Sequence, residues 1–446
     1  MKENSFLKHL YQHASKYLTG SVISAGTTLL MTKYYTYVFS TTEFGVLALY
    51  MVMFQYIVIL VSLNMDSGAT RFYFDYRKKR RDEYLSTIFW VITFFSIIVL
   101  FLGLMLMDTL SNLISPDSEL LYVVTIISGI AAVYVSFLMR VLFNEHKSSS
   151  VLKHTVFQSF MNHMTSVLFI SVWNLGILGR ISGQGTGYLS NLFSLLNGFY
   201  KNNLFKLKLQ FNFLMAKETF LLAIPGAITA FQNILFVYLD RFFIQHYIGN
   251  SEVGIYTLGY MLGQGLSLVY EAISQAIFPK VYTDMNENYE KARVELESFS
   301  YKYYIGLVIL TVIISLLSPI IVALFSNDNY ADASFVMPFV MAGFMMGGFY
   351  KIPSIVLGYH KKVWFYPFIA LSSFGVNALL NWYLIPIYGI VGAAFASFIG
   401  LFLYSIMIQI FSFKYLSKRY KIIVIILYLL IFSILLAISI MGEELR

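Results

Sequence analysis

Apolar residues occur along most of this chain in runs of roughly 20 residues, separated by short polar segments. Runs of this length are typical of helices that cross the hydrocarbon core of a bilayer, which is about 30 Å thick. The pattern therefore predicts an all-α polytopic membrane protein. We expect spans near 17–39, 46–66, 84–107, 119–143, 149–173, 175–200, 216–243, 252–277, 300–325, 332–358, 362–385, 390–412 and 421–441.

The segments between the predicted spans alternate in charge. Every second segment carries Lys or Arg, as at Lys147 and Lys153 or at Lys361 and Lys362. The intervening segments contain neither residue: 40–45, 108–119, 173–176, 249–252, 327–332 and 386–389. This alternation is the positive-inside pattern, so it predicts a cytoplasmic N-terminus. The last predicted span, 421–441, has no counterpart in the first half of the chain. The choice between twelve spans and thirteen or fourteen therefore stays open.

Short motifs of the first half recur in the second half. Residues 43–46 (Glu-Phe-Gly-Val) correspond to 252–255 (Glu-Val-Gly-Ile), and 176–179 (Gly-Ile-Leu-Gly) correspond to 389–392 (Gly-Ile-Val-Gly). We infer a duplication that yields two pseudo-symmetric six-helix lobes. The predicted organisation is an amphipathic interfacial helix at 1–16, an N-lobe with spans 1–6 at 17–200, a cytoplasmic linker at 201–215, a C-lobe with spans 7–12 at 216–412, and a cytoplasmic loop with an extra C-terminal helix at 413–446.

Composition supports this class and excludes others. The chain is 58% hydrophobic and only 12% charged, whereas soluble domains carry about 25% charged residues. It has no cysteine, no Walker A pattern, no H-E-x-x-H and no G-x-S-x-G, so disulfides, ATP hydrolysis and metal catalysis have no support. The net charge of +8 lies mostly in predicted cytoplasmic loops, which argues against nucleic acid. We expect a transporter rather than an enzyme, with neither metal nor cofactor.

Basic residues inside predicted spans are candidates for substrate binding, because a charge in hydrocarbon is costly. Lys33 and Arg241 lie near the outer ends of spans one and seven, at nearly equivalent positions of the repeat. Such a pair suits an anionic substrate, for example a phosphate or pyrophosphate. Lys351 and Arg180 are further candidates for a cationic cavity. The alternative is that Lys33 extends to the interface and Arg241 pairs with Asp240 or a neighbouring helix.

Three acidic residues are candidates for ion coupling, namely Asp66, Asp240 and Glu271. A carboxylate shielded from bulk water can carry a proton or bind Na⁺. The alternatives are that Asp66 lies at the membrane edge and that Glu271 satisfies a neighbouring polar group. Transport would then be driven by an ion gradient or by the substrate's own gradient.

Several glycines inside predicted spans have spacings that could be mistaken for phosphate-binding loops. They are Gly179, Gly183, Gly185 and Gly187, the pair Gly259 and Gly263, and the pair Gly343 and Gly347. Small residues at such spacings let membrane helices approach closely, so we interpret them as packing positions.

One stretch resembles a known family. Residues 377–397, NALLNWYLIPIYGIVGAAFAS, resemble the N-x-x-x-N…I-P-x-Y-G-I-x-G-A-A-x-A-[ST] signature of Wzx-type polysaccharide repeat-unit flippases. This polysaccharide transporter family is part of the multidrug/oligosaccharidyl-lipid/polysaccharide exporter superfamily. Asp240-Arg241-Phe242 followed by 252–256, together with 41–45 and 69–73, resembles further features of the same family.

The resemblance implies a V-shaped, MATE-like pair of lobes around a cationic cavity. It also implies that the protein moves an undecaprenyl-diphosphate-linked oligosaccharide across the bacterial cytoplasmic membrane, for O-antigen or capsule. The implied partners are membrane lipids, a polysaccharide polymerase and a chain-length regulator. Family members place cavity cations on helices one, two, seven and eight. Lys33 and Arg241 match the first and seventh, but no cation occupies the middle of the second or eighth.

Two other functions remain open. A multidrug/cation antiporter of the same superfamily would need an acidic cavity for cationic drugs, whereas the candidates here are mostly basic. A membrane glycosyltransferase or polymerase of the same pathway commonly carries a large catalytic loop outside the membrane, whereas every predicted outer loop here is short.

Overall fold

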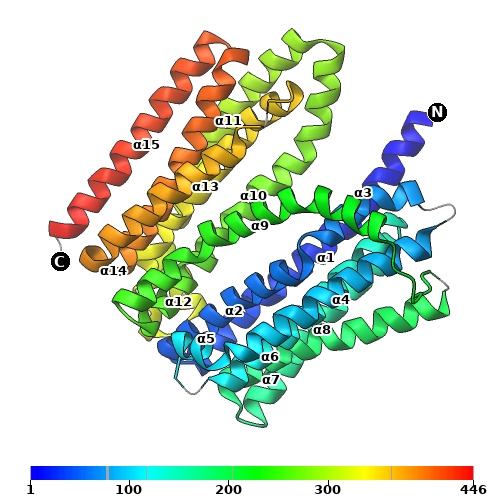
Figure 1. Cartoon of the computed structure of the whole chain (residues 1–446). Coiled ribbons are helices and arrows are strands. Elements are labelled where there is room, and N and C mark those ends of the chain that lie inside the picture. Colours follow the sequence, from blue (N-terminus) through cyan, green and yellow to red (C-terminus); the bar gives the residue numbers. More distant parts are fainter. Residues whose placement is uncertain (1, 77–79, 117, 203, 363, 445–446) are drawn as a thin grey trace. The chain divides into compact units, whose positions relative to one another are not determined.

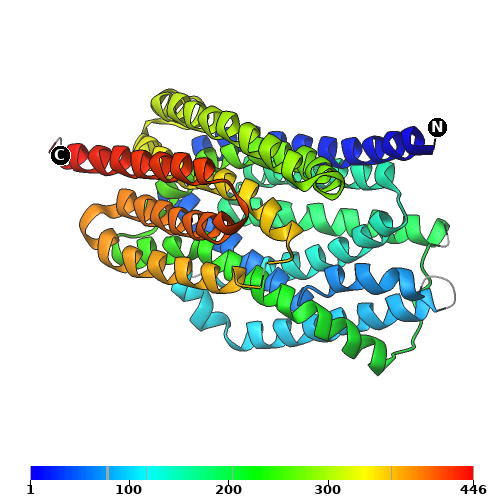
Figure 2. The same cartoon turned by 90° about the horizontal axis from the view of Figure 1, so that it is seen from above.

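The computed structural model describes residues 2–76, 80–116, 118–202, 204–362 and 364–444, without the side chains of residues 2–18, 21, 276, 279, 432 and 434–444. All regular secondary structure in this part of the chain is helical, which confirms the predicted fold class (Figures 1 and 2). The chain forms two compact units, Met1–Tyr238 (unit 1) and Leu239–Arg446 (unit 2).

Unit 1 holds the first eight helices and most of the ninth. They are α1 (Lys2–Val38), α2 (Thr41–Ser62), α3 (Met65–Tyr76), α4 (Arg81–Met105), α5 (Met107–Ile114), α6 (Glu119–Asn144), α7 (Ser148–Ser171), α8 (Gly176–Lys201) and α9 (Phe213–Tyr247), whose last residues belong to unit 2. Helix α8 packs along α7 and α6, and α1 packs against α7. These contacts build the core of unit 1.

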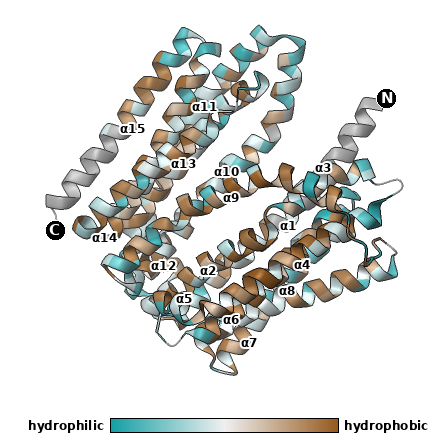
Figure 3. Ribbon diagram, in the orientation of Figure 1, coloured by the Kyte–Doolittle hydropathy of each residue, from teal (hydrophilic) through white to brown (hydrophobic). Residues whose placement is uncertain are grey.

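Unit 2 continues from the end of α9. Its other elements are α10 (Asn250–Glu287), α11 (Tyr289–Leu316), α12 (Ser318–Phe325), η1 (Asp328–Tyr330), α13 (Ala333–Tyr359), α14 (Tyr366–Ser412), η2 (Phe413–Tyr415) and α15 (Lys418–Glu444). Helix α13 is central, with α10 and α14 as its main partners and α11 against it as well. Hydrophobic residues cover most of the helix lengths, and hydrophilic residues gather at ends such as the α10–α11 turn (Figure 3).

Seven stretches of the described chain are long and apolar enough to cross a membrane. They overlap eight of the thirteen predicted spans and are Thr41–Tyr76, Arg81–Met105, Glu119–Asn144, Phe213–Tyr247, Tyr289–Leu316, Ala333–Tyr359 and Tyr366–Tyr415. The other five lie on α1, α7, α8, α10 and α15. Helices α7 and α8 are less apolar because they bury polar side chains, including His163 and Arg180. The total of thirteen spans stays a prediction.

The second predicted span, 46–66, does not end where the apolar run suggests. Helix α2 ends at Ser62, Leu63 and Asn64 adopt left-handed conformations (φ 42° and 59°), and α3 begins at Met65. Left-handed backbone is unfavourable for a leucine, and no Gly or Pro at this point marks the break. Asp66 thereby comes to lie in the first turn of a new helix.

The predicted connection at 386–389 is a tight turn inside the element named α14 (Tyr366–Ser412), where the backbone of Gly389 is not helical (φ 60°, ψ −141°). The chain folds back there: Asn377 Nδ2 lies 3.5 Å from Ser397 Oγ, although 20 residues of uninterrupted helix would span about 30 Å. Pro386 lacks a backbone N–H, so the helix loses a hydrogen bond here, and Gly389 can adopt positive φ at little cost. The pair explains how so short a turn joins two predicted spans.

The glycines act as packing positions, which confirms the interpretation from the sequence. A Cβ added to Gly187 would lie 2.9 Å from the backbone nitrogen of Asn162, and one on Gly259 would lie 2.7 Å from the carbonyl oxygen of Ala333. Helix α8 therefore approaches α7, and α10 approaches α13, closer than any side chain would allow.

The segment between α8 and α9 is fixed to the start of α4. The backbone N–H of Lys208 donates to Ser86 Oγ (2.9 Å), and Trp90 Nε1 donates to the carbonyl oxygen of Lys208 (2.9 Å). Further along, the N–H of Asn212 donates to Thr87 Oγ1 (3.2 Å). The linker predicted at 201–215 is thus a part of unit 1 with specific contacts.

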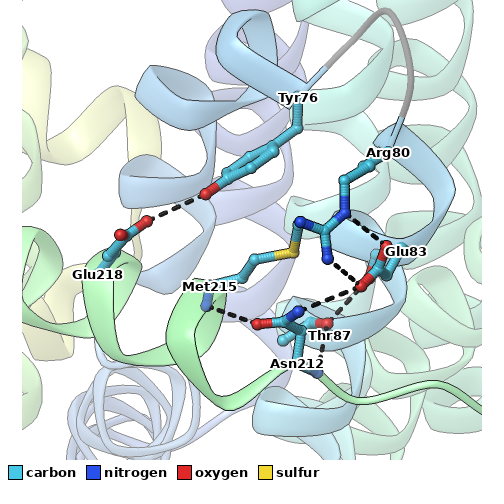
Figure 4. Close-up of polar contacts among 7 residues, drawn as sticks. All are labelled: Tyr76, Arg80, Glu83, Thr87, Asn212, Met215 and Glu218. Carbon is cyan, nitrogen blue, oxygen red and sulfur yellow. Dashed lines mark hydrogen bonds and ion pairs between the residues drawn. The ribbon is translucent and has the colours of Figure 1, made fainter.

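Asn212 then starts α9 and connects it to an ion pair (Figure 4). Its Oδ1 accepts from the N–H of Met215 (3.1 Å), which is N-cap geometry, and its Nδ2 donates to Glu83 Oε1 (3.2 Å). Arg80 binds both oxygens of Glu83, at 2.8 and 2.6 Å. One turn into α9, Glu218 accepts from Tyr76 OH (3.0 Å). An N-cap of this kind contributes about 1 kcal/mol.

The remainder of this part of α9 also packs on unit 1. Thr219 Oγ1 lies 3.0 Å from Tyr84 OH, and a Cβ on Gly68 of α3 would lie 3.1 Å from Ala223 Cβ. The packing boundary therefore falls between Tyr238 and Leu239, inside α9. The start of the second repeat, at residue 216, stays a prediction about duplication and does not coincide with this packing boundary.

The last helix, α15, is held in unit 2 by buried polar contacts. Tyr420 OH lies 2.9 Å from Tyr304 OH of α11 and donates to Gln409 Oε1 of α14 (3.2 Å), and Tyr428 OH lies 2.5 Å from Ser405 Oγ. Such bonds are specific because an unpaired buried hydroxyl is costly. The extra C-terminal helix is thus a structural member of unit 2.

Candidate functional site

A buried ion pair marks the start of unit 2. Asp240 and Arg241 are neighbours on α9, and they are 1% and 2% exposed. Asp240 Oδ1 accepts from the backbone N–H of Arg241 (2.8 Å) and from its Nη1 (3.1 Å). The guanidinium carbon also lies 4.7 Å from the centre of the Tyr260 ring, within the range of a cation–π contact. Arg241 is thus paired with Asp240, which favours the alternative reading over a free cavity cation.

The second oxygen of Asp240 is the centre of a polar network. Oδ2 accepts from Tyr256 OH of α10 and from Ser397 Oγ of α14 (3.4 Å). Asn377 Nδ2 lies 3.5 Å from Ser397 Oγ, and Asn381 Nδ2 donates to Asn377 Oδ1 (3.2 Å). All of these side chains are buried. Helices α9, α10 and α14 therefore meet at one carboxylate.

This network accounts for the polar residues of the stretch 377–397. Its two asparagines precede the turn at Gly389 and its terminal serine follows it, and the turn brings Asn377 next to Ser397. Asn381 Oδ1 is buried, and no described group donates a hydrogen bond to it. An unsatisfied buried acceptor is rare in proteins and is suited to a hydrogen-bond donor or a small hard cation.

A second ion pair of unit 2 is more accessible. Lys351 Nζ of α13 lies 2.7 Å from Glu271 Oε1 of α10, and the two side chains are 18% and 45% exposed. The ammonium group also lies 5.8 Å from the Tyr270 ring centre and 5.6 Å from that of Tyr350. The structure thus brings together one predicted substrate-binding residue and one predicted ion-coupling residue.

Arg180 occupies a different environment in unit 1. It is 9% exposed on α8, and its Nη1 donates to Asn162 Oδ1 (2.9 Å) and lies 3.4 Å from Ser166 Oγ. Its guanidinium carbon is 4.9 Å from the Tyr35 ring centre. Within the described part of the chain, no carboxylate forms an ion pair with Arg180. Among the described residues, the groups that contact its guanidinium are neutral.

His163 joins the Arg180 environment, and the sequence analysis did not identify it. It is 5% exposed, its Nδ1 lies 3.1 Å from Tyr35 OH, and its Nε2 lies 3.4 Å from Thr28 Oγ1. A signal was present, because Ser159, Asn162, His163 and Ser166 recur at helical spacing and form one polar stripe on α7. A polar stripe on a membrane helix indicates a face turned towards other protein groups.

Lys33 and Asp66 are the other candidates of unit 1, and neither has a described contact with the residues around Arg180. Lys33 is exposed on α1, and only its carbonyl group has a described hydrogen bond, from Thr36 Oγ1 (3.0 Å). Asp66 accepts from Ser136 Oγ (2.8 Å) and lies 3.8 Å from Arg140 Nε. Because Lys33 belongs to unit 1 and Arg241 to unit 2, their shared cavity stays a prediction.

Comparison of the fold with solved structures defines the class. The chain matches the lipid II flippase MurJ in an inward closed conformation with a TM-score of 0.73, over 96% of this chain and 92% of that chain, at 16% identity. It matches an inward-facing multidrug resistance MATE family transporter of the MOP superfamily with a TM-score of 0.71, over 86% and 93%, at 13% identity. The fold is that of MOP-superfamily transporters, which are multi-pass membrane proteins.

The sequence comparison gives the family. Residues 10–282 match the family model described as "Polysaccharide biosynthesis protein", so the chain belongs to the polysaccharide biosynthesis protein family. It is 26% identical over 239 residues to the capsular polysaccharide biosynthesis protein CapF of Staphylococcus aureus, a match that spans 51% of this chain and 57% of CapF. It is 22% identical over 291 residues to a membrane protein of Haemophilus influenzae whose function is uncharacterized, spanning 64% and 68%.

Proposed function

We propose that this protein is a flippase that moves an undecaprenyl-diphosphate-linked oligosaccharide repeat unit across the bacterial cytoplasmic membrane, for O-antigen or capsular polysaccharide. Membership of the polysaccharide biosynthesis family supports the glycan, and the MOP-superfamily fold supports a transporter rather than an enzyme. The name of CapF and the lipid II substrate of MurJ support a lipid-linked glycan.

The observation that carries the proposal is the environment of Arg180. A buried cation without a carboxylate partner is costly, and it is retained where an anion binds. Asn162 and Ser166 hold the guanidinium in one orientation, which favours bidentate contact with phosphate oxygens. Exposed Lys33 and Lys351, which pairs with Glu271, stay predicted members of the same cationic set. The diphosphate is the anion that this set suits.

Ion coupling would use the Asp240 network. A Na⁺ or H⁺ that reaches Asp240 competes with Arg241 for the same carboxylate. Ser397 donates to this carboxylate, and Asn377 and Asn381 continue the hydrogen-bonded chain behind it, so an ion bound at Asp240 would act on the whole network. Ion binding would thus release Arg241 from its partner and make it available to substrate. Asp66 and Glu271 are weaker candidates, because each has a partly exposed cation as its partner.

The mechanism that fits a duplicated transporter is alternating access, in which the two repeats rearrange around a fixed substrate site. The diphosphate would bind the basic residues, the glycan would cross in the hydrated interior, and the lipid tail would stay in the bilayer. A polysaccharide polymerase and a chain-length regulator would act on the glycan after export.

The test is the sidedness of the lipid-linked glycan pool. In a deletion strain, an impermeant glycan-directed reagent should fail to label an accumulated single repeat unit, because the unit stays on the cytoplasmic leaflet. Plasmid-borne wild type should restore labelling, and Arg180→Gln, expressed at the same level, should not. An outward-facing pool in the deletion strain would reject the flippase.

A multidrug/cation antiporter is the second candidate, because the MATE transporter fold covers 86% of this chain. It predicts drug resistance on overexpression, with loss of resistance in Asp240→Asn. The cationic Arg180 cluster argues against a cationic drug as the substrate.

A further inference from the structure

A cavity of about 240 Å³ opens among the ends of three helices of unit 1, away from the Arg180 cluster. The walls come from the end of α6, the α6–α7 turn, the first part of α7, the last turns of α8 and the start of the linker. The charge pattern predicts that this end of the helices faces the cytoplasm. The proposed transport site does not involve any of these residues.

The floor of the cavity is apolar and rigid. Leu142, Leu195 and Phe199 line it and are 2%, 0% and 3% exposed. Side chains this deeply buried are held in single rotamers by close packing. The cavity is smaller than the pockets of drug-sized ligands, which measure roughly 300–1,000 Å³, and much larger than the roughly 30 Å³ share of one water molecule. It fits one small polar group with a short apolar attachment.

The rim of the cavity carries groups that can donate hydrogen bonds. Lys147 precedes α7, Ser150 and His154 lie on its first two turns, and Asn202 follows α8. Together they offer an ammonium, a hydroxyl, an imidazole and an amide. The described lining contains no carboxylate. This set is selective for an anion.

His154 is oriented by a buried network behind the cavity. Its Nδ1 lies 2.8 Å from Asn191 Oδ1, and Asn191 Nδ2 donates to Gln158 Oε1 (2.8 Å). Because the Asn191 amide group is committed to Gln158, its carbonyl faces the imidazole and accepts from Nδ1. Asn191 is fully buried, so this arrangement is fixed. No described residue has a hydrogen bond to Nε2 of His154, so a ligand can use this nitrogen.

The nearest acidic residue in the chain does not neutralise the cavity. Glu145, two positions before Lys147, is 3.4 Å from Arg81 Nη1 and accepts a hydrogen bond from Tyr73 OH. Its described contacts are thus with α3 and α4. The basic character of the rim stays available to a ligand.

We infer that this cavity binds a phosphate group. Lys147 contributes the charge, Ser150, His154 Nε2 and Asn202 contribute directional hydrogen bonds, and the leucine and phenylalanine floor accepts the apolar part of an ester. Two sources carry this chemistry, an anionic phospholipid headgroup and a soluble phosphate compound. Either ligand would contact Asn202 and Leu204, where the linker to α9 begins, and would hold that end of the linker in place.

The experiment uses the full-length protein in phosphatidylcholine nanodiscs. Inorganic phosphate should raise the melting temperature in a concentration-dependent way, beyond sodium chloride of equal ionic strength. In a second arm, phosphatidylglycerol replaces part of the phosphatidylcholine. Lys147→Ala should weaken the response about tenfold, a change typical of one lost charge-assisted contact. Ser150→Asp should abolish it by repulsion without removing any packing group.

The matched control is Lys153→Ala, which removes the same charge from an exposed neighbour on α7 that does not line the cavity. A response to phosphate that Lys153→Ala keeps and Ser150→Asp loses identifies a soluble phosphate compound. If phosphatidylglycerol stabilises the protein but inorganic phosphate does not, and if Lys153→Ala keeps this effect while Ser150→Asp loses it, the ligand is a lipid headgroup. Equal responses of wild type and Ser150→Asp, or no response to either probe, would overturn the inference. Because the assay measures binding, its result does not depend on flipping.

Discussion

Arg180 of unit 1 and Arg241 of unit 2 are both buried arginines that stack on tyrosine rings, yet their charges are balanced differently. Asp240 pairs with Arg241 directly, whereas Arg180 has the neutral side chains of Asn162 and Ser166. A paired arginine contributes little net charge to its surroundings, and an unpaired one keeps its attraction for anions. Burial alone therefore does not identify a substrate-binding cation, and the charge of its partner has to be known.

The largest expected effect comes from removing the carboxylate of the paired arginine. Asp240→Ala leaves Arg241 buried without its counter-ion, and breaking a buried pair in this way costs about 3–5 kcal/mol. We expect a strongly reduced melting temperature and low membrane abundance. Thermal unfolding of the purified protein, followed by tryptophan fluorescence, measures this.

The double variant Asp240→Ala with Arg241→Met is the control for this test. It removes both charges and keeps the volume of the longer side chain, so it should recover much of the lost stability. If Asp240→Ala unfolds at the wild-type temperature, the pair is not important for the stability of unit 2, and the contrast with Arg180 loses its basis.

The next effect separates function from stability at the unpaired arginine. Arg180→Gln removes a charge without leaving an opposite charge buried, so the free energy of unfolding should fall by only about 1–3 kcal/mol, the cost of the lost hydrogen bonds. Export of the repeat unit should fall at least about tenfold if a charge-assisted contact to substrate is lost. Leaflet labelling and melting temperature are measured on the same variant.

Arg71→Gln serves as the matched control, since Arg71 forms an exposed i,i+4 pair with Asp75 and is 66% exposed. This variant should leave both export and stability unchanged. An Arg180→Gln variant that exports at the wild-type rate would remove Arg180 from the substrate site.

A smaller effect on stability is expected at Lys351 and Glu271. Their pair is partly exposed, and such pairs contribute about 0–1 kcal/mol. Lys351→Ala should therefore fold normally but export less glycan, whereas Glu271→Gln should change export only if the pair couples to an ion. A double-mutant cycle on export rates gives the coupling between the two residues. Additive effects would show that the pair does not act as a unit.

The smallest effect is expected at a helix end of unit 2. His360 follows α13, its Nε2 lies 3.1 Å from Tyr289 OH, and its ring stacks on Tyr415 at 4.0 Å. Burial lowers the pKa of His360 from the ordinary value of 6.5. The folded state thus favours the neutral ring, and stability should decline as the pH falls below that value. His360→Phe should show a flatter dependence of melting temperature on pH, and an identical dependence would contradict this.

Hydrophobic periodicity predicted the helical class and the approximate positions of most helices, because span length is set by the bilayer. It did not predict the break at Leu63 and Asn64, where no Gly or Pro stands in the sequence. The break depends on tertiary packing, since Asn64 lies directly against Gly226 of α9. A contact between such distant residues cannot be read from one sequence.

The candidate site shows the same limit. The ionisable residues within spans were identifiable from the sequence alone, and so was the alternative that Arg241 pairs with Asp240, because the two are neighbours. The pairing of Lys351 with Glu271 and the approach of Arg180 to Asn162 required the structure, because helices α10 and α13, or α7 and α8, must first be aligned. His163 was missed because a single histidine carries no motif, although the polar stripe around it was visible.

The attachment of residues 208–219 to α4 has a practical consequence for building hybrids of two family members. A junction at residue 216 would pair a foreign α9 with the native Tyr84 and Tyr76, and would separate the helix cap from most of the helix that it starts. A junction just after Tyr238 keeps that whole set of contacts from one parent. The predicted start of the second repeat and the boundary between the two packing units are therefore two different places in the same helix.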